Sequence, residues 1–283
     1  MIARDTGGRR RGSLRPWHLA PILPAILVVL VTVTLATAAP LVSPHSPTDQ
    51  NLLYAEEPPG TVYPVGADHL GRDVLSRVIY GARVSVALAA GTALAAAAIG
   101  ALVGSVAGYA RGWADGAISV IVDMQLAFPP VLLAIAMVSA LGPSLGNTAA
   151  VMVLTTWVVF ARLIRGDVLS LREREFVTAA WVLGGSPWRV LFRHVLPQTQ
   201  TALLVMLTLQ LGRMIVLEAT LSFLGLGVQP PEPSWGNLLA DGRDYLASSW
   251  WIATVPGVAI TLNVWAVNLV GDWLRDELDP RIG

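Results

Sequence analysis

The chain has 283 residues, of which 54% are hydrophobic and only 13% are charged, and its formal net charge is zero. A soluble domain carries about 25% charged residues, so a water-soluble fold of this length could not hide so much apolar surface. The zero net charge gives no bulk basic field for nucleic acid, and the lack of cysteine excludes disulfides and thiolate chemistry. All 19 basic residues are arginines, which excludes a Walker A loop and a Schiff-base lysine.

Six apolar stretches are each long enough to cross a bilayer, which takes about 20 helical residues. They predict an all-α integral membrane protein with six transmembrane helices, at residues 20–42, 84–109, 118–141, 147–164, 199–222 and 250–272. A tail of residues 1–19 precedes one transmembrane domain, residues 20–283. Proline occurs in the first, third and sixth stretches, where neighbouring helices can satisfy the carbonyl groups that it frees.

The first stretch has a second interpretation as a secretory signal peptide. Three arginines precede it, and Ala36-Thr37-Ala38 is similar to a cleavage site. Its apolar part, however, exceeds the ~7–15 residues of a signal sequence. We therefore favour a retained membrane anchor.

The distribution of arginine predicts the orientation in the membrane. With the N-terminus in the cytoplasm, 14 arginines fall on the inside and four on the outside, with Arg213 within the fifth stretch. We therefore expect both termini in the cytoplasm, with the chain in the plasma membrane and in contact with lipid. The outside loops are then 43–83 and 223–249, and the longest cytoplasmic loop is 165–198. Residues 235–247 are expected to form a short helix at the outer surface.

Glycine recurs every four residues in the second stretch, at Gly100, Gly104 and Gly108. This spacing removes the side chains from one face of the helix, so we expect another helix to approach it closely.

The cytoplasmic loop 165–198 predicts a helical hairpin. Phe176, Ala179, Ala180 and Leu183 share one helix face, and Gly184 and Gly185 end that helix. Ser186 is a good N-cap and Pro187 a good first residue for a second helix, on which Trp188, Leu191, Phe192 and Val195 share a face. Such a hairpin suits docking into a groove of a partner protein, or lying on the lipid headgroups.

The same loop resembles the cytoplasmic EAA loop of ABC importer permeases. Thr178-Ala179-Ala180, then Gly184, then Leu196-Pro197 have the spacing of that signature. Two positions depart from it, since Thr178 replaces the usual glutamate and His194 a usual aliphatic residue. The first departure removes any ionic contact that the glutamate would make to the ATPase.

Four further segments resemble one branch of that family, the C-type subunit of dipeptide, oligopeptide and nickel permeases. They begin with Gly66-Ala67-Asp68-His69-Leu70-Gly71-Arg72-Asp73 and include Ala127-Phe128-Pro129-Pro130, residues 218–231 and Pro233-Ser234-Trp235-Gly236. The resemblance implies a type I importer permease fold and an ATP-driven importer, with di- or oligopeptides as the default substrate. It implies three partners: a second, B-type permease, ATPase subunits that bind the ATP, and an extracytoplasmic substrate-binding protein. Residues 178–180 and 184–188 would then be the coupling contact with the ATPase.

Ionisable groups inside a membrane are costly and indicate function. The candidates for the pathway or a subunit interface are Asp123, Arg213 and Glu218, with Gln210, Asn263 and Asn268 as neutral companions. Arg213 and Glu218 are about 140° apart around a helix and do not share a face. For Asp123 and Glu218, near the ends of their spans, exposure at the membrane surface is the favoured alternative.

The sequence shows no catalytic constellation and no metal-ligand spacing, because its four histidines are scattered. His45, His69 and the acids Glu232, Asp241 and Asp244 are expected to be ordinary loop residues, with the acids in solvent or facing the binding protein. We therefore expect neither an enzyme nor a resident cofactor. A self-contained secondary transporter or channel remains the alternative function.

Overall fold

The computed structural model describes residues 22–278, and within that range all regular structure is helical apart from one isolated bridge between Ala67 and Asp73. The predicted tail, residues 1–19, lies outside the described residues. The helices, with the single-turn elements as η, are α1 (Ile22–Thr37), α2 (Ala39–Val42), η2 (Leu52–Tyr54), α3 (Val74–Ala110), α4 (Gly112–Leu126), α5 (Pro130–Leu141), α6 (Leu145–Leu171), α7 (Glu175–Val182), α8 (Pro187–Val190), η3 (Leu191–Val195), η4 (Leu196–Thr199), α9 (Gln200–Phe223), α10 (Trp235–Gly242), η5 (Arg243–Tyr245) and α11 (Trp251–Leu278).

Four of the predicted spans correspond to helices that are long and apolar enough to cross a membrane. These are α3, α6, α11 and the continuous helix Pro187–Phe223 that includes α9. The first stretch forms α1, an apolar helix of only 16 residues, followed by the short α2. The described chain therefore has four long spans, or five if the bent pair α4–α5 is counted as one, and six spans remain compatible with it.

The prediction of one continuous helix at 118–141 is wrong. α4 and α5 are separate helices that meet at 90°. Pro129 and Pro130 lie at the break, where the ring removes a backbone donor and restricts the preceding residue to extended conformations. The pair is a broken span or a re-entrant segment.

The helices beside two of the predicted loops are longer than the predicted spans. α3 begins at Val74, so residues 74–83 of the predicted loop 43–83 are helical, and α6 continues to Leu171 into the predicted loop 165–198. At ~1.5 Å per residue the 37 residues of α3 span about 55 Å, whereas the hydrocarbon core is about 30 Å thick. α3 therefore extends well beyond the membrane.

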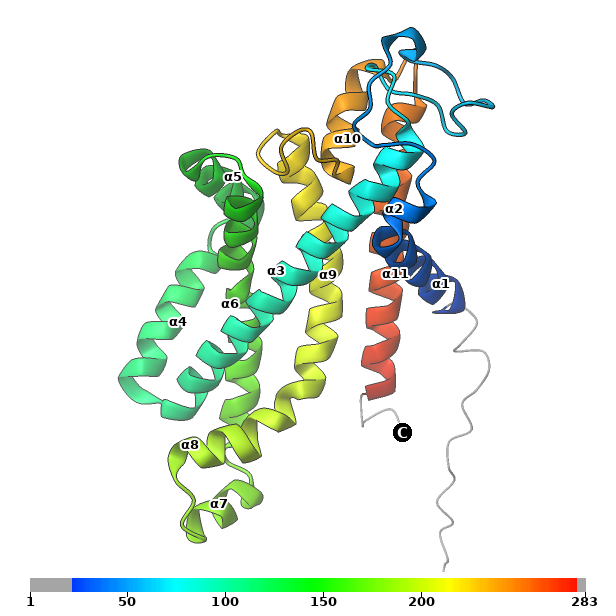
Figure 1. Ribbon diagram of the computed structural model, residues 1–283. Helices are drawn as coiled ribbons and strands as arrows, with labels where there is room; N and C mark the ends of the chain where they lie inside the picture. Colours follow the sequence, from blue (N-terminus) through cyan, green and yellow to red (C-terminus); the bar gives the residue numbers. More distant parts are fainter. Residues whose placement is uncertain (1–21, 279–283) are drawn as a thin grey trace, which may run out of the picture.

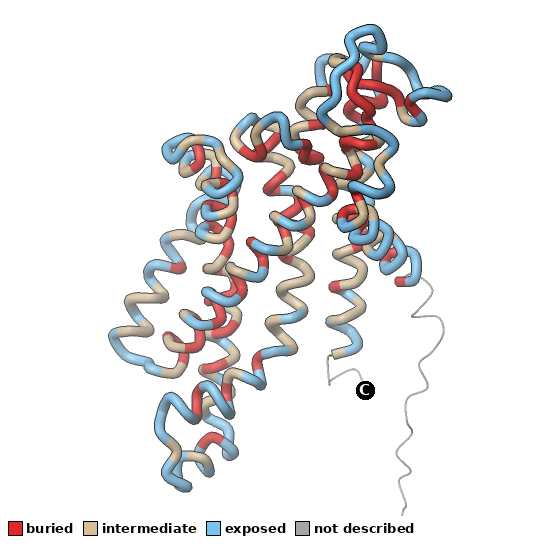
Figure 2. The backbone as a smooth tube through the Cα atoms, viewed as in Figure 1, coloured by how far each residue is buried: buried red, intermediate tan, exposed pale blue. Residues whose placement is uncertain are grey.

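The helices form an elongated bundle around α3 (Figure 1), which runs obliquely across it and packs on α6 and α9, while α1 packs on α11. The hairpin α7–α8 lies at one end, called the hairpin end below. Residues 43–73 and α10 lie at the opposite end, called the loop end. Buried residues follow the inward faces of α3, α6 and α9 (Figure 2).

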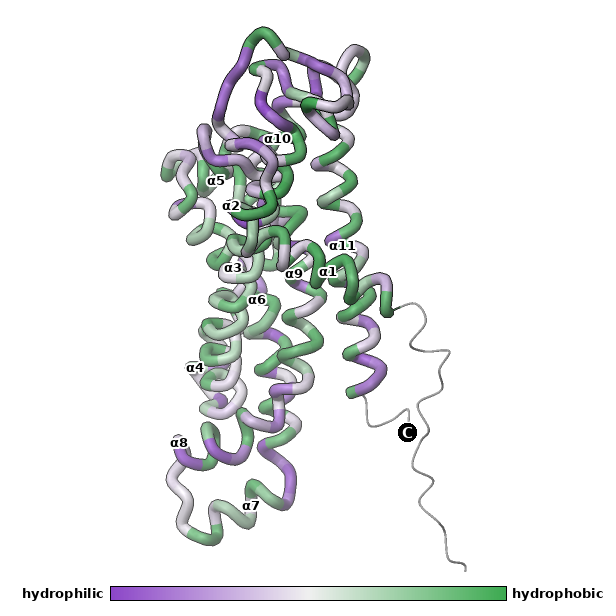
Figure 3. Tube along the Cα trace, turned by 45° about the vertical axis from the view of Figure 1, so that its right-hand side comes forward, coloured by the Kyte–Doolittle hydropathy of each residue, from purple (hydrophilic) through white to green (hydrophobic). Residues whose placement is uncertain are grey.

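Apolar side chains also cover the outside of the bundle. At most half of the apolar part of each long helix is buried within the chain, and hydrophobic residues recur along the length of the helices (Figure 3). Exposed Leu23, Leu27, Leu94 and Leu132 are examples. In water such a surface would be unstable, so the lipid bilayer is the solvent for these faces.

The close approach of a helix to the glycine face is confirmed. A Cβ on Gly100 would lie 2.5 Å from the Trp157 carbonyl oxygen, and one on Gly104 would collide with the carbonyl oxygen of Ala161. Gly108 is as tightly placed, with its Cβ position 2.8 Å from the Arg165 oxygen. α3 and α6 thus touch backbone to backbone over two turns, which maximises van der Waals contact where no hydrophobic effect is available.

We predict that Gly104→Ala lowers the stability of the subunit, by about 1–3 kcal/mol, because α3 and α6 must separate to admit the methyl group. Gly91→Ala is the matched control, since this glycine of α3 has no atom within 4 Å of its Cβ position. It should be neutral, or stabilising by up to about 1 kcal/mol. Thermal unfolding of both purified variants in detergent measures the difference, and equal melting temperatures would contradict the packing argument.

Candidate functional site

The segment between α6 and α9 folds as the predicted helical hairpin. α7 ends at Val182, and Gly184 follows with a φ of +83°, in the left-handed region that favours glycine. A Cβ on Gly185 would lie 2.7 Å from the Ala180 carbonyl oxygen, so this position has no room for a side chain. Pro187 then opens α8, where its missing N–H has no cost.

Two details of the hairpin differ from the prediction. Ser186 occupies the N-cap position in an extended conformation, but its side chain makes no capping hydrogen bond. The second helix of the hairpin also continues directly into the fifth span, whereas a separate short helix was predicted. α8 continues through the π turn η3 and the 3₁₀ turn η4 into α9, so that Pro187–Phe223 is one irregular helix of 37 residues.

The hairpin has one packed face and one open face. Val177, Val190, Leu191 and Val195 are buried against Ile164 and Val168 of α6. The residues of the predicted apolar faces mostly remain exposed, as do Thr178 and Ala179. We call the following large apolar residues the open face: Phe176, Trp181, Val182 (82% exposed), Leu183 (87%), Trp188 (59%) and Phe192.

Aromatic and charged contacts attach the hairpin to the end of α3. The Arg172 guanidinium donates a hydrogen bond to the Tyr109 carbonyl oxygen and lies 5.6 Å from the centroid of the Tyr109 ring. Trp181 stacks on the Tyr109 ring, with 6.5 Å between the two ring centroids. Arg111, directly after α3, pairs with Glu173. Movement of the hairpin is therefore coupled to α3 as well as to α9.

The predicted intramembrane polar residues fall into different environments. Gln210 and Asn263 are buried, and the Asn263 amide donates to the Ala259 carbonyl oxygen at 2.9 Å. Asn268 lies against α9, with its Oδ1 2.9 Å from the Cβ position of Gly212. Arg213 is exposed on the surface of the chain, and its hydrogen bond to Gln210 is 3.3 Å long.

Asp123 and Glu218 differ from each other in exposure. The Asp123 side chain is 60% exposed and pairs with Arg162 at 2.7 Å, which joins α4 to α6. The sequence favoured exposure at the membrane surface for both residues. For Glu218 that prediction is wrong, because the residue is 0% exposed. It lies inside the chain because the loop after α9 and α10 fold back over the end of that helix.

Hydroxyl groups surround the buried Glu218. Ser222 donates to its carboxylate at 2.7 Å and accepts from the Val228 backbone N–H at 3.1 Å. Next to it Ser85 accepts from the Trp235 backbone N–H at 3.1 Å, and the Trp235 indole donates to the Val78 carbonyl oxygen at 3.0 Å. This cluster fixes α10 to α3 and α9.

A buried ion cluster at the loop end was missed by sequence reasoning. Asp68 receives Arg72 Nε at 2.6 Å and also pairs with Arg77. Both arginines reach Asp241 of α10 at 3.3 Å. Asp68, Arg72 and Arg77 are buried and the Asp241 side chain is 34% exposed, so the prediction of a solvated Asp241 is wrong. The four charges lie in the two predicted outside loops, which have no periodic pattern that would have placed them together.

The electrostatics of Asp68 follow from its partners. Burial disfavours its charged form, but the guanidinium groups of Arg77 and Arg72 outweigh burial, and two backbone N–H groups add to them. The pKa of the Asp68 carboxyl therefore lies below its ordinary value. The stabilisation is present above the unfolded pKa of about 3.9 and is lost as the pH falls through the folded pKa.

The two outer histidines have structural partners in the loop. His45 Nδ1 lies 3.2 Å from Asp73, the N-cap residue of α3, and the His69 ring stacks on Tyr245 at 5.3 Å. Among residues 22–278, no group of three or more His, Asp or Glu side chains is placed to hold a metal ion.

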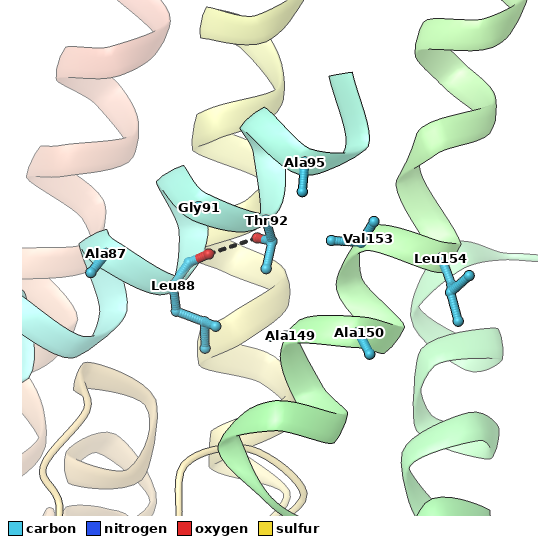
Figure 4. A pocket seen from close by; sticks show the side chains of 9 residues that line it. All are labelled: Ala87, Leu88, Gly91, Thr92, Ala95, Ala149, Ala150, Val153 and Leu154. Carbon is cyan, nitrogen blue, oxygen red and sulfur yellow. Dashed lines mark hydrogen bonds between the residues drawn. The ribbon is translucent and has the colours of Figure 1, made fainter. Parts of the chain in front are cut away.

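An open apolar groove of about 510 Å³ lies between α3 and α6 (Figure 4). Ala87, Gly91 and Ala95 line it from α3, and Ala149, Ala150 and Val153 line it from α6. Its one polar side chain, Thr92, donates to the Leu88 carbonyl oxygen at 2.7 Å. The groove has no chemical group free to react, and suits apolar contact with another helix or with lipid.

A bundle of membrane-spanning helices with an exposed apolar hairpin at one end agrees with the permease subunit of an ABC importer. Residues 100–283 match the family described as binding-protein-dependent transport system inner membrane component. The chain belongs to this family.

Several related permeases are similar in sequence to this protein over nearly its whole length. It is 39% identical over 271 residues to the di/tripeptide transport system permease protein DppC of Pseudomonas aeruginosa, over 94% of this chain and 89% of that protein. It is 39% identical to the dipeptide transport system permease protein DppC of Alkalihalophilus pseudofirmus, over 91% and 84% of the two chains. It is 40% identical to the glutathione transport system permease protein GsiD of Escherichia coli, over 95% and 88%.

We predict that Asp68→Asn destabilises the loop end by about 3–5 kcal/mol, because Arg72 and Arg77 would keep only the partly exposed Asp241 as counter-charge. Limited proteolysis of residues 43–73 and thermal unfolding both report this. Asp49→Asn, a change at an exposed aspartate of the same loop, should have no effect. Acidification below the lowered folded pKa of Asp68 should open the loop of the wild type in the same way, and a loop that stays protected in Asp68→Asn would refute the role of the cluster.

Arg213→Leu should lower uptake about tenfold or more while membrane insertion stays normal, since a charge at this depth is retained only where it meets water or a partner. Arg243→Leu is the control, because that exposed arginine pairs only with its neighbour Asp244. Uptake in proteoliposomes and the amount of inserted protein are measured side by side. Unchanged uptake would remove Arg213 from the pathway residues.

Proposed function

We propose that this chain is the C-type permease subunit of an ATP-driven importer of di- or oligopeptides. It forms the translocation pathway together with a second, B-type permease. ATPase subunits bind the hairpin on the cytoplasmic side, and an extracytoplasmic substrate-binding protein delivers the peptide. The relatives' names, which refer to di/tripeptides, dipeptides and glutathione, support this substrate class.

The observation that carries the proposal is the open face of the hairpin. Val182 and Leu183 are more than 80% exposed at the tip, whereas Val177 of α7 and Val190 of α8 are buried. An apolar tip held rigidly at the end of the molecule is typical of a helix that docks in a partner's groove. Thr178, also exposed, would make a neutral contact there.

The path of the chain suggests how force reaches the membrane. α8 leads into α9 without a loop, so displacement of the hairpin is passed along the helix that carries Arg213 and Glu218. The π and 3₁₀ turns at residues 191–199 can absorb part of the bend. In the proposed cycle ATP closes the ATPase pair, the hairpin follows, and the helices rock as packed bodies to give alternating access.

The arginine distribution supports a cytoplasmic hairpin end. Arg172, Arg174, Arg189 and Arg193 lie in or beside the hairpin, whereas Arg72 and Arg77 at the loop end are neutralised by Asp68 and Asp241. Positive residues are retained on the cytoplasmic side, so this distribution supports an outside position for α10 and residues 43–73. The C-terminal end of α11 lies toward the hairpin side of the bundle (Figure 1), in agreement with a cytoplasmic C-terminus.

Two features support a second permease as partner. Arg213 is exposed on α9, and a cation in the membrane requires a partner or water. The groove between α3 and α6 offers small residues for close contact with a helix. The chain supplies no phosphate-binding lysine, so in the proposed importer ATP is bound by another subunit. A secondary transporter would instead follow an ion gradient without a partner.

The sharpest test is a pair of substitutions on the open face, Val182→Asp with Leu183→Asp. Each apolar residue contributes about 1.5 kcal/mol or more when buried in a partner, so ATPase binding should weaken about 100-fold and ATP-driven uptake should fall with it. Neither residue packs in the subunit, so insertion and stability should not change. Uptake and co-purification of the ATPase are measured.

Leu246→Asp, an equally apolar exposed residue at the loop end, is the control and should retain the ATPase. Deletion of residues 176–196 is the more drastic version. Survival of ATP-driven uptake in either hairpin variant would show that the coupling role is wrong.

A further inference from the structure

The extended loop before α3 ends in a hydrophobic tip. Leu52 is 70% exposed and Leu53 is 91% exposed, in the short turn η2. Leucines fixed in water at such exposure carry a cost that a loop could avoid with polar residues. An apolar tip of this kind marks a contact with something outside the chain.

The tip is built rather than loose. The Asn51 side chain accepts from the Leu53 N–H at 3.3 Å, and the Asn51 N–H donates to the Leu70 carbonyl oxygen at 3.1 Å. Gly71 is so close that a Cβ there would collide with the Asn51 carbonyl group. The turn is thus fixed to the segment that holds Asp68 and Arg72. A rigid apolar contact loses little conformational entropy on binding.

The position of the tip argues for an aqueous partner. η2 is the short blue turn at the top of Figure 1, beyond the adjacent ends of α3 and α10 and at the opposite end of the molecule from α7 and α8. The apex of the same loop is hydrophobic in Figure 3, where the segments next to it are polar. The tip therefore points away from the helices that cross the bilayer.

The charge around the tip narrows the class of partner. Residues 43–71 contain Asp49, Glu56, Glu57 and Asp68 but no arginine or lysine. Asp68 is neutralised within the chain by Arg72 and Arg77, which leaves three acids near the tip. A protein with an apolar hollow and a basic rim complements these acids and the leucines between them.

We infer that Leu52 and Leu53 are the anchor by which the substrate-binding protein docks on this subunit, inserting into an apolar hollow with a basic rim. This inference rests on the proposed function, which supplies that partner. Docking at the tip has a route into the bundle, because the loop is joined through Asp68, Arg72 and Arg77 to α3 and to Asp241 of α10. α10 in turn packs on α9 and α11.

The first experiment uses the importer assembled with its ATPase in nanodiscs and the binding protein that supports its uptake. Leu52→Ser with Leu53→Ser should weaken binding of the substrate-loaded binding protein at least tenfold and reduce its stimulation of ATP hydrolysis, with basal hydrolysis unchanged. Leu246→Ser, an exposed leucine elsewhere at the loop end, should bind as the wild type does. Wild-type affinity in the double variant would overturn the proposal.

The second experiment uses the absence of cysteine from this chain. Leu53→Cys introduces one thiol, whose labelling by a membrane-impermeant maleimide is followed by the mass of this subunit. Labelling should be fast in proteoliposomes and at least tenfold slower with saturating binding protein, while Leu246→Cys is unaffected. Slow labelling without the binding protein would indicate a lipid-covered tip, and equal labelling with and without it would refute docking there.

The outcomes separate this inference from the proposed function. If the wild-type complex shows no ATP-driven uptake, the proposed function fails. If uptake occurs but the tip variants bind the binding protein normally, only the assignment of Leu52 and Leu53 fails.

Discussion

Backbone contact between α3 and α6 is the constraint on which the arrangement of this subunit depends. In a bilayer, helices gain little from burying apolar surface, because lipid is as apolar as leucine. Gly100, Gly104 and Gly108 bring the two helices close enough for van der Waals contact between main chains. The resulting pair is the fixed support against which α9 packs and from which both ends of the molecule extend.

Charge is concentrated at the two ends of this support and serves different purposes there. At the loop end Asp68 and the arginines around it are buried in a closed cluster that stabilises the fold of the loop. The charge of the surface there comes from the exposed acidic side chains. At the hairpin end the pair Arg165–Asp115 at 2.5 Å and the pair Arg162–Asp123 join α4 to α6. The apolar open face projects beyond them. Both ends are thus held by ion pairs, and each also presents exposed apolar residues.

Local patterns predicted the parts of the fold that depend on neighbouring residues in the chain. The length of the apolar stretches found the long spans, helical periodicity found the hairpin, and glycine spacing found the face of α3, because each pattern lies within one segment of the chain. The break at Pro129 was not predicted, since proline is tolerated in many membrane helices and only tertiary packing decides whether it bends one by 90°. The burial of Glu218 and the pairing of Asp241 were missed because both depend on how α10 folds back.

The length of α3 explains how events at two distant ends can belong to one mechanism. Its N-cap, Asp73, is part of the loop-end network, and its last turn, at Tyr109, stacks with Trp181 of the hairpin. α3 is helical without interruption between these points, and it is held to α6 by contacts that leave no space for sliding sideways. A load applied at either end must therefore move the α3–α6 pair as a unit. Helical geometry is irregular at residues 127–129 and 191–199, so these two segments are places where the helices can bend while the α3–α6 pair stays intact.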